Sequence, residues 1–163
     1  MRLPEITPSP AHALRSTHPC REPWEAREVR RAKDLEFAAM ERAYHRTGGL
    51  ALGDELAQRL GERLEQPISV VARWIVSRTV LSFGWRSQTL LPLFQFDAKD
   101  MSLRPAVADV VRELVDVFDD WELAVWFAQP NGWLRYAAPV DAIGRDPSAV
   151  LCAARAERFV ARG

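Results

Sequence analysis

Residues 105–128, PAVADVVRELVDVFDDWELAVWFA, decide the fold class because they contain two successive helical patterns. Pro105 suits the first turn of a helix, where the missing N–H has no partner to lose. Six apolar residues then recur at helical spacing and form one face: Val107, Val110, Val111, Leu114, Val117 and Phe118. Asp119 or Asp120 is placed to cap a second helix that continues to Ala128. The stretch predicts a mainly α protein.

Helical patterns continue to the C-terminus. Pro130, Asn131 and Gly132 predict a turn, and Pro139 can begin a short helix. Asp146-Pro147 supplies a cap and a first-turn proline for a last helix. The apolar stripe of that helix consists of Val150, Leu151, Ala154 and Phe159. We therefore expect residues 98–163 to form a helical lobe.

The N-terminal third divides into two segments. Residues 24–46 contain neither Gly nor Pro, and Phe37, Met40 and Tyr44 follow helical spacing, which predicts one long amphipathic helix. An exposed apolar stripe on that helix is the basis for the hypothesis of a homodimer. Residues 1–23 hold five prolines, which favours an extended or flexible arm.

Residues 47–97 predict a winged helix-turn-helix-like segment. Leucines spaced by four residues predict a first short helix: Leu52, Leu56, Leu60 and Leu64. Pro67 opens a second helix, with an expected inner stripe of Ile68, Val71, Ala72 and Ile75. Alternation at Leu81, Phe83 and Trp85 then predicts a strand, and Thr89–Phe94 a second one. Pro92 favours an edge position for the second strand, so we expect one small β-hairpin.

Composition limits the classes of function. The 163 residues include 22 basic and 22 acidic side chains, so the chain as a whole is not steered to nucleic acid. The start of the sequence lacks the apolar core of a secretory signal, and no apolar run reaches the roughly 18 residues that span a bilayer. Cys20 and Cys152 form no CxxC pair, which favours reduced thiols in the cytoplasm. We expect no membrane association.

The sequence gives no positive indication of an enzyme. His12 and His18 with Cys20 form only a loose cluster without ordinary metal-ligand spacing. No glycine-rich phosphate-binding loop occurs. The acidic residues Asp119, Asp120 and Glu122 are explained by capping better than by catalysis. Cys152, beside alanines, is expected in the core. We therefore predict no catalytic residues, no metal and no cofactor.

Tryptophan is concentrated between Asp119 and Ile143, where the rings can fill a core or form a recognition surface. Trp121 shares the apolar face of its helix, so we assign it to the core. Trp126 and Phe127 lie elsewhere around that helix, and one helix in a small lobe is not expected to bury its whole circumference. The predicted partner-binding residues are Trp126, Pro130, Asn131, Trp133 and Tyr136.

A second possibility is DNA binding through the helix-turn-helix-like segment. Its second helix would present Arg73 and Arg78 to a major groove. Two arginines are few, because affinity for DNA comes mostly from neutralised phosphates. A winged fold kept only for packing is the alternative.

Residues 121–154, WELAVWFAQPNGWLRYAAPVDAIGRDPSAVLCAA, resemble the C-terminal toxin-binding domain of the Xre/MbcA/ParS antitoxins. The resemblance covers about residues 101–160 and is carried by Trp121, Ala124, Trp126, Pro130, Asn131, Leu134, Pro139 and Asp141. Residues 68–97 resemble the degenerate winged segment that precedes this domain in the family, with a matching end at Pro92, Gln95, Phe96 and Asp97. The chain departs from the family where Arg135-Tyr136 follow Leu134 in place of a glycine.

The resemblance implies an antitoxin-like protein that binds and neutralises a partner toxin, often of the RES type that consumes NAD. It also implies repression of its own operon. The alternative is a DNA-binding transcriptional regulator without a toxin partner.

Overall fold

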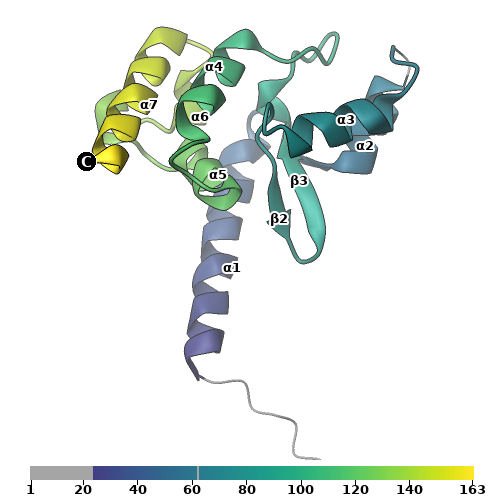
Figure 1. Cartoon of the computed structure of the whole chain (residues 1–163). Coiled ribbons are helices and arrows are strands. Elements are labelled where there is room, and N and C mark those ends of the chain that lie inside the picture. The colour runs from purple at the N-terminus through teal and green to yellow at the C-terminus, as the bar shows by residue number, and fades with distance from the viewer. Residues whose placement is uncertain (1–23, 62) are drawn as a thin grey trace, which may run out of the picture.

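The computed structural model describes residues 24–61 and 63–163, and their fold is mainly helical with a small three-stranded antiparallel sheet (Figure 1). The fold-class prediction is therefore confirmed, although the sheet has one strand more than the expected hairpin. The predicted arm at residues 1–23 and its His12, His18 and Cys20 lie outside the described residues. The elements are α1 (Trp24–His45), β1 (Leu50–Leu52), α2 (Gly53–Leu60), α3 (Pro67–Val76), β2 (Phe83–Trp85), β3 (Gln88–Pro92), η1 (Leu93–Gln95), α4 (Pro105–Leu114), α5 (Asp120–Ala128), η2 (Gly132–Leu134), α6 (Pro139–Ala142) and α7 (Pro147–Arg162).

The C-terminal half of α1 is built into the core, while its N-terminal half extends away from the other elements (Figure 1). Met40 and Tyr44 are buried, and the Tyr44 hydroxyl donates a hydrogen bond to the Ala124 carbonyl of α5 at 2.6 Å. The helix ends at His45, and the turn that follows contains Gly48 and Gly49, whose φ angles of 109° and 82° are accessible to glycine without strain. The predicted long helix is confirmed.

Because the Tyr44 hydroxyl is buried, we expect the fold to lose stability in alkaline solution. Burial raises the pKa of its hydroxyl well above the ordinary value of about 10. The unfolded chain therefore loses this proton at a lower pH than the folded chain does. The free energy of unfolding is unaffected by the titration of this group below about pH 10 and falls as the pH rises further. We expect Tyr44→Phe to lower the free energy of unfolding by about 1 kcal/mol at neutral pH and to remove this alkaline dependence. Urea unfolding at several pH values between about 8 and 11 measures both effects. An equal dependence of the free energy of unfolding on pH in wild type and Tyr44→Phe would contradict this role.

The sheet order is β1-β3-β2, so β3 is the central strand. The predicted edge position of this strand is wrong. Pro92 is tolerated because it is the last residue of β3, where it lies opposite Leu50 and no further ladder follows. The sequence pattern missed β1 because Leu52 also fits the four-residue spacing of leucines in α2.

The β2–β3 hairpin is fixed to α1 and α5 by aromatic contacts. Trp85 at the end of β2 stacks on Phe37 of α1, with ring centroids 4.3 Å apart, and on Trp121 of α5 at 5.6 Å. The turn residues Arg86 and Ser87 have positive φ angles of 45° and 66°, which match the twist of a two-residue hairpin turn. The hairpin is therefore packed against the helices as well as paired within the sheet.

Helices α2 and α3 enclose a second, smaller core that includes Leu56, Leu60, Val71 and Phe96. The predicted inner stripe of α3 is only partly correct, because Ile68 and Ala72 are exposed. Trp74 instead packs on Phe96 with ring centroids 5.9 Å apart, and this contact turns the Val71–Ile75 side of α3 inward.

Helices α4 and α7 pack together in the C-terminal lobe, with Val107, Val110, Val111 and Leu114 buried as predicted. Asp119 caps α5: its Oδ1 accepts from the Glu122 N–H at 2.7 Å, and the Glu122 carboxylate accepts from the Asp119 N–H at 2.9 Å. The capping interpretation of this acidic cluster is confirmed.

Gln95 ties the end of β3 to the segment that precedes β2. Its side chain is fully buried, and its Nε2 donates to the carbonyls of Leu81 and Pro92 at 2.8 and 2.9 Å. Its Oε1 accepts from the Leu81 N–H at 2.8 Å. All the groups involved are removed from water, so this amide satisfies three backbone groups that would otherwise be buried without partners.

Candidate functional site

The α5–α6 connection brings together four of the five predicted partner-binding residues. Trp133 and Tyr136 are 64% and 79% exposed, and Pro130 is also exposed. Asn131 is buried beneath them. The loop thus presents two large rings to solvent at positions three residues apart.

Asn131 holds this loop in shape. Its Oδ1 accepts from the Trp133 N–H at 2.9 Å, and its carbonyl accepts from the N–H groups of Leu134 and Tyr136 at 3.0 and 2.9 Å. Its own N–H donates to the Ala137 carbonyl at 3.1 Å. Leu134, between the two rings in the sequence, is buried, whereas Trp133 and Tyr136 point to solvent from the loop that these hydrogen bonds hold. Asn131 therefore positions the aromatic pair and does not itself offer a contact surface.

The loop contains two residues with left-handed backbone. Arg135 has φ 55° and Tyr136 has φ 64°, and each carries a Cβ that makes this region unfavourable by about 1 kcal/mol or more. These are the positions where the sequence departs from the glycine of the resembled family. The left-handed backbone forms here in spite of the departure.

A groove with a volume of about 630 Å³ lies beside the exposed Trp133 ring. It is lined by Trp133, Leu134, Arg135, Ala137, Ala142, Arg145, Asp146 and Ala149. Neither Arg135 nor Arg145 forms an ion pair with another described residue. We use the name Trp133 surface for Trp133, Tyr136, Arg135 and Arg145 together with this groove.

Sequence reasoning did not identify Arg135 and Arg145 as part of the site. Arg135 was visible as a neighbour of Trp133, but only the fold of α6 brings Arg145 to the same groove. Asp146 on the rim is already engaged as the cap of α7: its Oδ1 accepts from the Ser148 hydroxyl at 2.6 Å and the Ala149 N–H at 2.9 Å. The hydrogen bond from the Ser148 hydroxyl has the largest effect on the Asp146 carboxyl. Together with the bond from the Ala149 N–H, it lowers the pKa of this carboxyl and favours its ionised form.

The prediction that Trp126 is part of the exposed surface is wrong. Trp126 is 9% exposed and packs edge-to-face on Phe127, which is fully buried, with ring centroids 5.1 Å apart. Helix α5 contacts α6 within the lobe and also α1 and β2, which the sequence pattern placed outside this lobe. The circumference of α5 is therefore covered more completely than a lobe of residues 98–163 alone would allow.

Arg78 is likewise not available to DNA. It follows α3, and its Nε pairs with Asp120 at 2.8 Å while its Nη2 donates to the Phe118 carbonyl at 2.8 Å. Its Nη1 donates to the Val115 carbonyl. The guanidinium thus binds the carbonyls that follow α4 and the carboxylate at the start of α5, and it connects this junction to the helix-turn-helix-like segment.

Arg73 is exposed on α3 as predicted, with the exposed Ser69 and Ser77 one turn away on either side, but an exposed apolar stripe lies beside this face. Ile68 and Val76 are 69% and 85% exposed, and Ala72 lies between them. A DNA-reading helix more commonly presents polar and basic groups to base edges and phosphates. With Arg78 turned away, α3 contributes one arginine to any groove-facing surface in the described chain.

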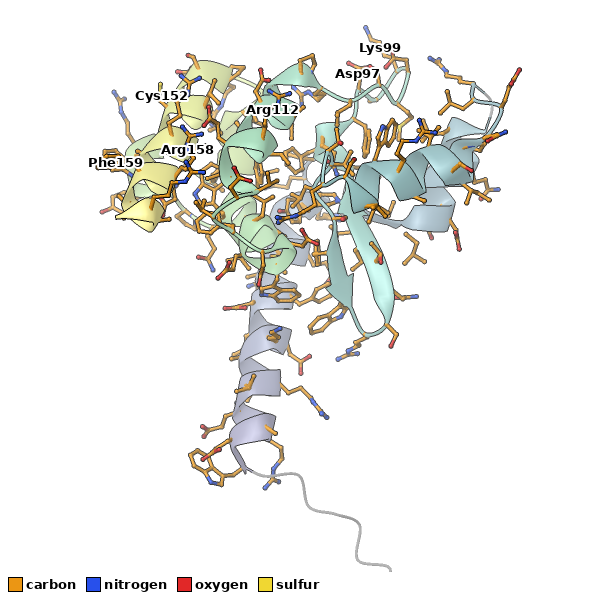
Figure 2. All side chains as sticks on the ribbon, viewed as in Figure 1. Asp97, Lys99, Arg112, Cys152, Arg158 and Phe159 are labelled. Carbon is orange, nitrogen blue, oxygen red and sulfur yellow. The ribbon has the colours of Figure 1, made fainter. Side chains whose placement is uncertain are left out.

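Within residues 24–61 and 63–163, no group of three or more His, Cys, Asp or Glu side chains is placed to hold a metal ion. Cys152 is exposed, so its predicted core position is wrong. It lies with Phe159 on the outer side of α7 (Figure 2). No helix in the described ranges has both the length and the apolar character that crossing a bilayer demands.

The site therefore consists of a groove lined by Trp133 and two arginines without ion pairs to described residues, with the exposed ring of Tyr136 on the same loop. Such a combination suits recognition of a macromolecular surface. Comparison of the chain with protein-family models, with curated proteins and with solved structures found no match.

Proposed function

We propose that this chain is an antitoxin-like protein that binds and neutralises a partner toxin through the Trp133 surface, in the cytoplasm. The observation that carries the proposal is the exposure of Trp133 and Tyr136 on a loop that Asn131 holds rigid. Large rings that are fixed in an exposed position lose little conformational entropy when a partner covers them.

The left-handed backbone of the loop supports the same conclusion. Strain at an exposed loop is unfavourable to folding, and strained residues concentrate at binding sites and switches. The two residues concerned, Arg135 and Tyr136, both belong to the Trp133 surface. The loop conformation that presents the rings is therefore maintained at a measurable cost in stability.

The chemistry of the Trp133 surface favours a partner with an apolar anchor surrounded by carboxylates. The groove can accept an apolar side chain beside Trp133, while Arg135 and Arg145 can each form charge-assisted hydrogen bonds with acidic groups. The resemblance to the Xre/MbcA/ParS antitoxins implies a RES-type, NAD-consuming toxin as the partner. The product of the adjacent reading frame is the protein to examine first.

Two variants test the proposal without disturbing the fold. Trp133→Ala removes an exposed ring, and Tyr136→Gly removes the second ring while relieving left-handed strain, so the stability of the second variant should rise slightly. We expect each variant to weaken binding of the adjacent-frame protein about tenfold to hundredfold, because exposed aromatic anchors are frequent hot spots. Growth rescue on co-expression should fail in parallel.

The matched control is Phe159→Ala, which removes an exposed ring of similar size from α7 outside the Trp133 surface (Figure 2). It should retain wild-type affinity in calorimetry and wild-type growth rescue. If Phe159→Ala weakens binding as much as the two loop variants, or if the loop variants bind normally, the proposed surface is wrong.

The DNA-binding regulator is the second candidate, and the exposed Arg73 on α3 is the observation in its favour. This function predicts retention of the chain on operator DNA that falls steeply with salt and is reduced by Arg73→Ala. It also predicts no effect of Trp133→Ala. Arg73 is the one arginine of α3, and affinity for DNA comes mostly from neutralised phosphates, so this function is the weaker of the two.

A further inference from the structure

The first ten residues of α1 form a helical extension that is largely exposed, although Lys33 at its end lies over the Trp121 ring of α5, 5.2 Å from the ring centroid. Every residue from Trp24 to Lys33 is exposed, and Val29 is 62% exposed (Figure 1). Isolated helices shorter than about 12–15 residues are marginal in water, so this extension gains little from its own hydrogen bonds. Cover from another molecule would stabilise it.

A groove runs between this extension and the tip of the β2–β3 hairpin, with a volume of about 530 Å³. Its α1 side is lined by Glu25, Ala26, Val29, Arg30, Lys33 and Asp34. These positions follow the helical repeat and so lie on one face of α1. Trp85 and Arg86 form the other side, and Arg86 is fixed by its ion pair with Asp34 at 3.3 Å.

The charges along this face are complementary to a second copy of the same face in antiparallel orientation. When Val29 lies on the twofold axis, Glu25 of one copy meets Lys33 of the other. This opposite-charge pair then occurs twice, as an isologous interface requires. Sliding one helix so that Ala26 meets Lys33 would place Glu25 against Asp34, a like-charge pair, so the charges select the register.

The small residues near the axis permit the two helices to approach closely. Ala26 of one copy meets Ala32 of the other in this register, and Val29 meets Val29 at the centre. The start of the second α1 would then lie beside Trp85 and Arg86 and fill the groove. We propose that this face is the interface of a homodimer, with the α1 extensions paired antiparallel through Val29.

Charge reversal tests the interface in sedimentation velocity of the full chain. Glu25→Lys alone, and Lys33→Glu alone, each place two like-charge pairs in the interface and should raise the dimer dissociation constant by about tenfold or more. The double variant restores both pairs and should return the constant close to the wild-type value. Within one chain the two residues are eight positions apart, so an effect on one isolated chain would not be rescued in this way.

Two further measurements keep the proposal falsifiable. Arg27→Glu, an exposed change on the opposite side of α1, should leave the dissociation constant unchanged. Val29→Cys, in a chain with Cys20 and Cys152 replaced by serine, should form a disulfide-linked dimer on mild oxidation, whereas Arg27→Cys should not. A wild-type chain that remains monomeric at about 100 μM, or a double variant without rescue, overturns the proposal.

Discussion

Gln95→Ala is expected to lower the free energy of unfolding by about 4 kcal/mol, the largest effect that we predict for a single substitution. The change leaves the Leu81 N–H and the carbonyls of Leu81 and Pro92 without a partner in a region sealed from water. It also opens a cavity where a fully buried side chain stood. Equilibrium unfolding in urea, followed by tryptophan fluorescence, measures the loss.

Two comparisons separate the hydrogen-bonding role of Gln95 from its volume. Gln95→Glu keeps the volume but replaces the donor by an acceptor that faces two carbonyls, so it should be nearly as destabilising as alanine at neutral pH. Gln88→Ala, on an exposed position of β3, should change the free energy of unfolding by less than about 0.5 kcal/mol. A stability of Gln95→Ala within about 1 kcal/mol of wild type would contradict this assignment.

Arg78→Ala is expected to lower the free energy of unfolding by about 2–3 kcal/mol. The guanidinium forms an ion pair with Asp120 and donates to the carbonyls of Val115 and Phe118, so its removal frees three acceptors at the junction of α4 and α5. The alanine keeps the same left-handed backbone, because Arg78 itself has φ 50°. Thermal or urea unfolding measures the change.

Arg73→Ala is the matched control for Arg78, since it removes the same charge from an exposed position on α3. We expect its free energy of unfolding to stay within about 0.5 kcal/mol of wild type. Equal losses of stability in the two variants would show that Arg78 has no structural role beyond that of a surface arginine. The pair also informs the DNA hypothesis, because only Arg73 can weaken DNA binding without weakening the fold.

The helices could be predicted from the sequence because their signals are local. The valine spacing of α4 fixes both its existence and its buried face, and the Asp119–Glu122 capping box marks the start of α5. Asp146 marks the start of α7 in the same way. Each of these signals lies within one or two helical turns, so no tertiary information is required to interpret it.

The sheet and the buried face of α3 could not be predicted equally well. Strand β1 has three residues, and its Leu52 also fits the leucine repeat of the following helix. The central position of β3 depends on pairing with β1, which is distant in sequence. Which side of α3 turns inward is decided by Trp74 packing on Phe96, a contact that helical periodicity cannot reveal.

The candidate site was partly visible in the sequence. The turn at Pro130-Asn131-Gly132 identified the loop that presents Trp133 and Tyr136, because turn chemistry is local. Trp126 was misplaced because the sequence does not reveal that α5 packs against α1, about ninety residues earlier, and β2 as well as against α6. Gln95 shows the same limit: a glutamine in the QF pair after β3 is visible, but its three backbone partners are not.

The central claim is that the Trp133 surface is where the partner binds, and hydrogen–deuterium exchange of the complex with the adjacent-frame protein tests it most directly. We expect protection on binding to be concentrated in residues 130–145, with the amides of Trp133, Arg135 and Tyr136 slowed most, while α3 exchanges as it does in the free chain. Protection confined to α3, with residues 130–145 unchanged, would contradict the account.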